Sequence, residues 1–174
     1  MSDIEKIIEE KSKIMAESKP KIFDLEKPAD QEAVSKLFSE NKIQHVHDDY
    51  WEQLHELFMV NNASIIFAPH FEKDFEVHLK NLEKKSSLWQ QGRWVFYPWL
   101  STLVHILEDN EFQLVRTTRN KNLINQDEQE KFYDATVGIG GLSVGNNIAL
   151  TIALQGGAKR LRLADHDKLA LSNT

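Results

Sequence analysis

The stretch Val137-Gly-Ile-Gly-Gly-Leu-Ser-Val-Gly145 begins the segment that decides the fold, and Leu163-Ala-Asp165-His-Asp167 ends it. These residues predict a short strand, a glycine-rich turn, an apolar helix and a second strand that ends at an acid. This order is typical of the opening β-α-β unit of a nucleotide-binding sheet. We therefore expect an α/β fold in which residues 135–174 begin a Rossmann-like domain.

The glycines of this turn suit the binding of phosphate. Because Gly138, Gly140 and Gly141 lack a Cβ, the main chain can turn tightly and approach phosphate oxygens, which the N-terminus of the following helix also attracts. Asp165 follows Gly145 by 20 residues, which places an acid at the end of the second strand for the ribose hydroxyls. Ser143 stands where the G-x-G-x-x-G pattern has its third glycine.

Glycine usage divides the chain, because six of the seven glycines lie at or after Gly138 and the other is Gly92. We predict a small N-terminal α/β region at 1–90, a β-rich connecting segment with an entry helix at 91–134, and an incomplete nucleotide-binding domain at 135–174. Two parallel strands alone would leave an open edge and an uncovered sheet face. The chain is therefore expected to be a fragment of a longer protein.

The bulk composition limits the class of protein. The chain has a net charge of −6 and no cysteine. An acidic chain is a poor binder of nucleic acid, and the lack of cysteine excludes disulfides, thiolate metal sites and cysteine nucleophiles. No apolar run is long enough for a membrane span, and no secretory signal is present. We expect a cytoplasmic protein without nucleic-acid or membrane partners.

Hydrophobic periodicity predicts alternating helices and strands in the first 90 residues. Helices are expected at 3–17, 28–38, 50–60 and 71–82. Strands are expected at 21–25, 43–47 and 64–68. The helix at 3–17 is interpreted as an arm that packs on its own domain, with a contact to a partner or a second subunit as the alternative.

Residues 92–107 are rich in aromatic and β-branched side chains and predict two strands joined near Pro98. A short strand is expected at 112–115, and a helix at 126–133 after Asn125 as its N-cap. The aromatic side chains of this region are interpreted as the core of a hairpin, or alternatively as an interface for a carrier protein. They are Trp89, Trp94, Phe96, Tyr97 and Trp99.

The histidines offer few catalytic or metal-binding candidates. His45 and His47 would share one side of a strand before Asp48 and Asp49, which is a workable metal-ligand spacing. No second cluster supports such a site, so we assign no metal ligand. His105 is interpreted as a packed histidine in an apolar strand.

Four stretches together resemble one family. They are Gly138-x-Gly140-Gly141-Leu142, Gly156-Gly157-Ala158, Leu163-Ala164-Asp165-x-Asp167 and Leu171-Ser172-Asn173. Over about residues 116–174 the chain resembles the E1-like, ThiF/MoeB-type adenylyltransferases. Through residues 92–99 and 141–145 it also resembles a bacterial group in which an N-terminal region precedes an E1-like domain, often followed by a nitroreductase-like flavin domain.

The resemblance implies roles for the matched residues. Gly138, Gly140 and Gly141 would line the ATP phosphates, Asp165 and less strongly Asp167 would bind the ribose, and Asn173 would approach the phosphates. Arg119 would match an arginine that reaches the ATP of a neighbouring subunit, which implies a homodimer. Asn122 replaces the second arginine of that family segment.

The family's reaction defines the expected function. A carboxylate, usually the C-terminus of a small ubiquitin-like carrier protein, attacks the α-phosphorus of ATP, and pyrophosphate leaves as an acyl-adenylate forms. We expect the parent protein to be such an enzyme with ATP and Mg²⁺ as cofactors. Its catalytic cations and its Mg²⁺-binding aspartate are expected beyond Thr174, so this chain alone is expected to be inactive.

Two other functions stay open at this point. One is a non-catalytic nucleotide-binding module that regulates an attached nitroreductase-like flavin domain. The other is an NAD-type Rossmann oxidoreductase.

Overall fold

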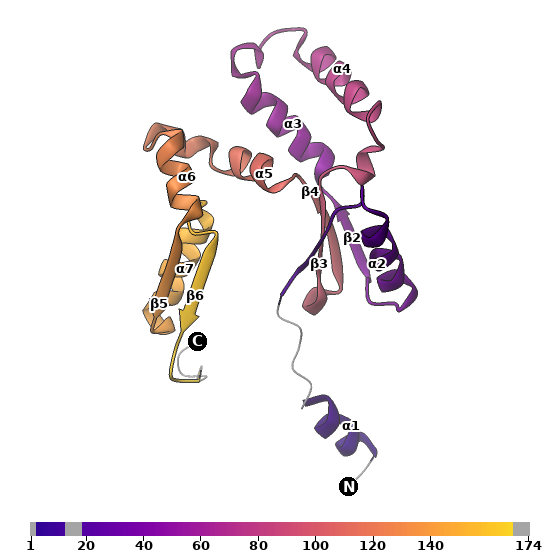
Figure 1. Ribbon diagram of the computed structural model, residues 1–174, viewed down its shortest axis with the longest axis vertical. Helices are drawn as coiled ribbons and strands as arrows, with labels where there is room; N and C mark the ends of the chain where they lie inside the picture. Colours follow the sequence, from indigo (N-terminus) through magenta and orange to yellow (C-terminus); the bar gives the residue numbers. More distant parts are fainter. Residues whose placement is uncertain (1–2, 13–18, 169–174) are drawn as a thin grey trace. The chain divides into compact units, whose positions relative to one another are not determined.

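The computed structural model describes residues 3–12 and 19–168 (Figure 1). The chain divides into two compact units, residues 1–112 and residues 113–174. Both units combine helices with strands, which confirms the predicted α/β class. Among the described residues, no helix has the length and apolar character that crossing a membrane requires.

Unit 1 (residues 1–112) is built on a mixed four-stranded sheet. Its strands are β1 (Lys21–Phe23), β2 (His45–Asp48), β3 (Arg93–Tyr97) and β4 (Thr102–Ile106). They lie in the order β1-β3-β4-β2, and β3 is antiparallel to both of its neighbours, whereas β2 is parallel to β4. The two strands predicted at 92–107 therefore belong to the same sheet as the strands of residues 1–90, and not to a separate connecting segment.

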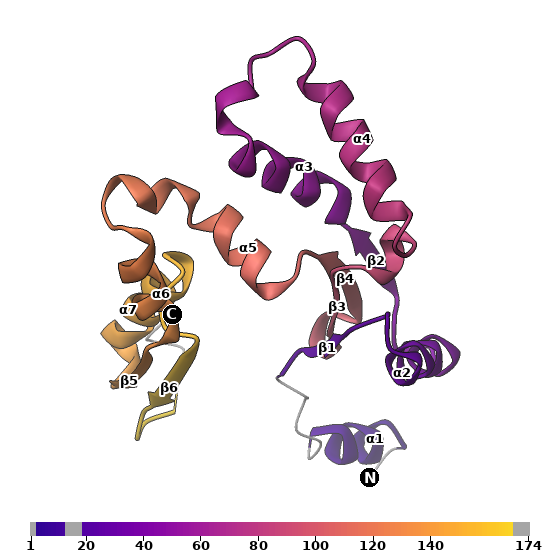
Figure 2. The same cartoon turned by 45° about the horizontal axis from the view of Figure 1, so that its top comes forward.

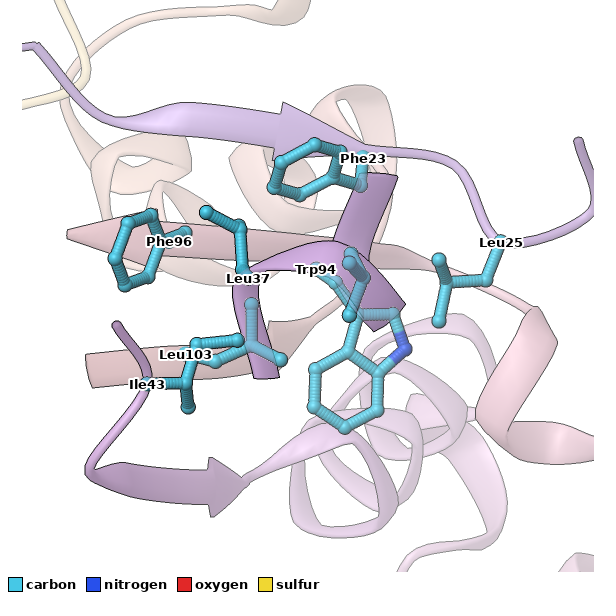
Figure 3. Packing of buried hydrophobic residues seen from close by; sticks show 8 residues of the cluster. Phe23, Leu25, Leu37, Ile43, Trp94, Phe96 and Leu103 are labelled. Carbon is cyan, nitrogen blue, oxygen red and sulfur yellow. The ribbon is translucent and has the colours of Figure 1, made fainter. Parts of the chain in front are cut away.

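Helix α2 (Pro28–Ser39) supplies one side of the main hydrophobic core (Figure 3). Pro28 starts the helix, where its missing N–H costs nothing, and Asp30 in the first turn suits the positive end of the helix dipole. Buried side chains from this helix and the sheet form one cluster. Its members are Phe23, Leu25, Val34, Leu37, Ile43, Trp94, Phe96 and Leu103.

Helices α3 (Tyr50–Asn61) and α4 (Phe71–Glu83) lie side by side and pack through aromatic rings (Figures 1 and 2). The ring of Phe58 lies 5.3 Å from that of Phe71 and 5.5 Å from that of Phe75, measured between centroids. The prediction of a strand at 64–68 between these helices is wrong. The segment forms a 3-10 turn (Ala63–Ile65), and Phe67 is 99% exposed, so this apolar run is a loop between two helices.

The hairpin β3–β4 turns through a 3-10 turn at Pro98–Leu100, and Ser101 takes a positive φ of 49° to complete it. Trp94 and Phe96 are buried under α2, as the hairpin-core interpretation expects. Trp89 and Trp99 are about half exposed, so the aromatic group as a whole is not one core.

His105 on β4 is a packed histidine, as predicted. Its ring is 1% exposed and stacks between the rings of Trp94 and Tyr50, at centroid distances of 4.3 and 4.4 Å. Its Nδ1 lies 2.8 Å from a carboxylate oxygen of Asp48, and its Nε2 lies 2.8 Å from the carbonyl of Gln91. Asp48 thus holds His105 in place rather than joining His45 and His47 in a metal site.

Helices α5 and α1 bear on two further predictions from the sequence. The predicted strand at 112–115 is wrong, because residues 109–116 form helix α5 (Asp109–Arg116). Acids in its first turn and Arg116 in its last turn interact favourably with the helix dipole and so favour a helix. The strand prediction relied on the short apolar run and did not take these charges into account. Helix α1 (Asp3–Ser12) confirms the described part of the helix predicted at 3–17, and its Ile4, Ile7 and Ile8 are exposed.

Unit 2 (residues 113–174) contains a β-α-β arrangement preceded by short helices. Its elements after α5 are the 3-10 helix η4 (Thr118–Asn122), α6 (Gln126–Asp134), β5 (Thr136–Gly140), α7 (Leu142–Leu154) and β6 (Arg160–Ala164). Asn125 caps α6 in a capping box with Glu128, which confirms the predicted cap. Strands β5 and β6 pair in parallel, and α7 connects them.

Much of the apolar surface of this β-α-β arrangement is exposed. Helix α7 buries only Gly145 and Ala149 fully, because a two-stranded sheet covers one side of a helix. The apolar side chains that remain about half or more exposed are Val144, Ile148, Leu150, Leu154 and Leu163. On β5 the alternate residues Thr136, Gly138 and Gly140 are exposed as well, which agrees with the prediction of an uncovered sheet face.

Candidate functional site

The carboxyl ends of β5 and β6 bring the glycine-rich turn and the predicted acid together. Gly140 pairs with Ala164 at the last position of the parallel ladder. The amide of Gly141 then donates to the carbonyl of Ala164 at 2.9 Å, which ties the turn to the end of β6. Asp165 follows directly, so the turn and the acid share the edge of the sheet where α/β proteins bind ligands.

The turn itself depends on glycine at one position and leaves open space at three. Gly141 has a φ of +83°, which side-chain-bearing residues rarely adopt. A Cβ built on Gly138, Gly140 or Gly141 would meet no atom of the described residues within 4 Å. The described residues therefore leave the space beside these three glycines open to solvent.

Asp165 binds the N-terminus of α7. One of its carboxylate oxygens accepts a hydrogen bond from the Leu142 amide at 2.5 Å, and the other accepts from the Asp167 amide at 3.0 Å. These two amide donors, first that of Asp167 and then that of Leu142, lower the pKa of Asp165, and His166 nearby adds to the effect. The sequence predicted the place of this acid but not its role as a helix cap.

Acid is expected to release the N-terminus of α7. Because the pKa of Asp165 is lower in the folded chain than in the unfolded chain, its carboxylate stabilises the fold above the unfolded value of about 4. That contribution is lost as the pH falls from about 4 through the folded pKa. The amide resonance of Leu142 should follow this titration, and Asp165→Asn should abolish it. A Leu142 resonance that titrates equally in the variant would contradict this cap.

Gly145 is a structural residue that the sequence pattern did not single out. A Cβ on Gly145 would lie 2.6 Å from the Cγ2 atom of Ile139, so only glycine lets α7 pack this closely on β5. In dinucleotide-binding folds the third glycine of the turn serves this packing. Here Gly145 serves it two residues after Ser143, which explains how the chain tolerates a side chain at 143.

The opposite end of α7 is fixed by two more glycines. A Cβ on Gly156 would lie 2.3 Å from the Cγ2 atom of Thr117, and Gly156 has a φ of +72°. A Cβ on Gly157 would lie 2.1 Å from the ring of Phe132 on α6. Both glycines therefore allow Thr117 and Phe132, which precede β5 in the chain, to pack closely against the end of α7. Neither glycine lies beside the glycine-rich turn.

The structure places Arg119 away from the glycine turn of its own chain. Arg119 lies in η4, and its neighbour Asn120 donates to the carbonyl of Gln155 at 3.0 Å, at the C-terminal end of α7. Since α7 has 13 residues, the turn lies about 20 Å away at the other end. A contact between Arg119 and a ligand at the glycine turn would therefore require the turn of a second copy of the chain.

Asp167 and Asn173 are the remaining site residues that the sequence predicts. Asp167 is exposed, and its backbone amide donates to the carboxylate of Asp165. Asp165, His166 and Asp167 offer ligand atoms within 4.8 Å of one another, a set suited to a divalent cation, whereas the sequence predicted only ribose binding for the two acids. Exposed groups of this kind are common without an ion. Asn173 lies outside the described residues.

The arrangement offers groups for binding rather than for proton transfer. Leu142, Ser143 and Val144 begin α7, and the first N–H groups of a helix lack partners within the helix. The carboxylate of Asp165 takes the Leu142 amide. Those of Ser143 and Val144 point toward the same edge and can donate to phosphate oxygens. The site therefore combines an anion-binding helix end with an acid that still has acceptor capacity.

The chain is similar to a curated protein over part of its length. An uncharacterised protein of Mycobacterium tuberculosis is 47% identical over 81 residues, which cover 47% of this chain and 11% of that protein. The matched segment is therefore a small part of a much longer relative. No family model matches the chain. No solved structure matches it either.

Proposed function

We propose that this chain supplies the phosphate-binding turn and the ribose-binding acid of an E1-like, ThiF-type, ATP-dependent adenylyltransferase. In the proposed reaction, a carboxylate attacks the α-phosphorus of ATP, pyrophosphate leaves, and an acyl-adenylate forms. The carboxylate belongs to the C-terminus of a ubiquitin-like carrier protein or to a similar substrate. Mg²⁺ would accompany the ATP phosphates and reduce their charge.

The open space beside three glycines is the observation that carries this proposal. A glycine retained for packing has an atom close to the place of its missing Cβ, as Gly145, Gly156 and Gly157 do. Gly138 and Gly140 have no such neighbour among the described residues and no positive φ, and both take exposed positions of β5 that a ligand can reach. Close approach of a ligand does account for them, and phosphate is the ligand that a helix N-terminus favours.

The position of Asp165 supports a nucleotide rather than a free phosphate. A carboxylate has about four acceptor positions, and the amides of Leu142 and Asp167 take two of them. The others can accept the two hydroxyls of a ribose. Because the same carboxylate touches the first residue of α7, a ribose bound to it has its phosphates near the turn.

Binding of ATP by this chain tests the proposal at its first step. Calorimetric titration with MgATP should show binding to the 174-residue chain, and Asp165→Ala should weaken it about tenfold or more by removing a charged acceptor. NAD⁺ should bind less tightly than ATP. Tighter binding of NAD⁺ would instead favour the oxidoreductase alternative.

Chemistry requires a separate test, since a binding module would show the same affinity. In the complete parent protein, exchange of labelled pyrophosphate into ATP, dependent on a carboxylate substrate, is expected for an adenylyltransferase. ATP binding without exchange would favour a regulatory nucleotide-binding module.

A further inference from the structure

Unit 1 contains a cavity of about 510 Å³ that the nucleotide site does not use. Helix α3 gives one wall through Tyr50, Leu54 and Phe58, and Glu108 and Glu111 close another side. Leu54 is buried, so this wall is a packed apolar surface. The cavity is of the size that small-molecule sites usually have.

Tyr50 brings a hydroxyl group to the wall of this cavity. The residue is 5% exposed, its ring stacks on His105, and its ring edge lies against Gly92, where a Cβ would come within 2.6 Å of Cε2. Within the described part of the chain, its hydroxyl has no hydrogen-bond partner. Burial raises the pKa of Tyr50, and the cavity-lining carboxylates Glu111 and Glu108 raise it further. The hydroxyl is therefore available for a hydrogen bond with a ligand in the cavity that Tyr50 lines.

The charge around the cavity is negative. Four carboxylates line it, those of Asp24, Glu26, Glu108 and Glu111, against the cations of Lys85 and Arg93. Arg93 forms ion pairs with Glu108 and, at 3.8 Å, with Asp24. Among the described residues Glu111 has no ion-pair partner. Burial, followed by the charge of Glu108, raises the pKa of Glu111, so a cationic partner here would relieve both effects.

We propose that this cavity binds a small molecule with a primary ammonium group on an apolar or aromatic body. The ammonium group donates to the carboxylate of Glu111 and to the oxygen of Tyr50. The apolar body lies against Leu54 and Phe58. This site is separate from the proposed nucleotide site, since all of its lining residues belong to unit 1.

Three probes of similar shape and different charge test this proposal on the 174-residue chain. Calorimetry with 2-phenylethylamine, 2-phenylethanol and phenylacetate should show that the protonated amine binds at least tenfold more tightly than the neutral alcohol, and that the anion does not bind. A charge-assisted hydrogen bond in a partly buried site gives a preference of this size.

Variants locate the binding. Glu111→Gln keeps the side-chain shape and should reduce the preference for the amine over the alcohol to about one. Tyr50→Phe should weaken amine binding severalfold, because the ring stays and the hydroxyl is lost. Glu83→Gln, at an exposed position of α4 outside the cavity, should change nothing.

Two outcomes would overturn the proposal. One is binding of all three probes with equal affinity, or of none. The other is an amine preference that Glu111→Gln leaves intact. If a variant fails to fold, backbone amide shifts in the unaltered chain decide: the amine should shift the amides of Tyr50, Phe58 and Glu111, and shifts confined to other residues would contradict the site.

Discussion

Gly140→Ala is expected to lower the affinity for MgATP about a hundredfold and to leave the fold intact. The new methyl group meets no atom of residues 3–12 and 19–168 within 4 Å, and Gly140 does not have the positive φ that alanine would resist. The methyl therefore enters the space where phosphate oxygens approach the backbone. Calorimetric titration gives the affinity, and hydrogen exchange in β5 and α7 gives the integrity of the fold.

Gly138→Ala is the graded control for this substitution. Its surroundings are equally open, but it lies two residues earlier on β5, about 6.6 Å further from the N-terminus of α7. It is expected to lose less affinity than Gly140→Ala. Equal affinity for ATP in the Gly140→Ala variant and the unaltered chain would show that the open space is not a phosphate site.

Gly156→Ala is expected to destabilise unit 2 by about 3 kcal/mol. A positive φ of +72° costs a residue with a side chain about 1–2 kcal/mol. The methyl would also lie 2.3 Å from the Cγ2 atom of Thr117, which is buried, and such overpacking adds about 1–3 kcal/mol. The buried hydrogen bond from Gln129 to the carbonyl of Gly156 would be strained as well.

The measurement must report on unit 2 alone. All four tryptophans lie in unit 1, at positions 51, 89, 94 and 99, so tryptophan fluorescence does not follow the β-α-β arrangement. Hydrogen exchange of the α7 amides does, and Gly156→Ala should lower their protection about a hundredfold. Gly138→Ala should leave that protection unchanged. Unchanged protection of the α7 amides in Gly156→Ala would contradict the close packing of Thr117 against Gly156.

The β-α-β arrangement of unit 2 could be predicted because the residues that indicate it are consecutive in the sequence. Strand, glycine turn, helix and acid are consecutive, so the order alone predicts that Gly140 and Asp165 meet at one edge of the sheet. The packing roles of Gly156 and Gly157 could not be predicted from the sequence. Their neighbours Thr117 and Phe132 lie 39 and 25 residues earlier in the chain. A glycine kept for packing and one kept for a ligand look alike until their neighbours are known.

Unit 1 was predicted less completely for related reasons. The short apolar runs at 64–68 and 112–115 fit a strand or a helix equally well, and only the surrounding helices decide between them. The parallel pairing of β2 with β4 and the contact of Asp48 with His105 join residues 57 positions apart. The cavity beside Tyr50 draws on segments from Asp24 to Glu111, and no local pattern marks it.

A titration of the ¹⁵N-labelled chain with MgATP, followed through its backbone amides, tests the nucleotide assignment most directly. Binding at the glycine turn should shift the amides of residues 140–144 together with that of Asp165, and adenosine without phosphates should leave the amides of Ser143 and Val144 unmoved. If ATP shifts none of these amides, or shifts only residues outside the turn, the glycines do not hold phosphate and the proposed function is wrong.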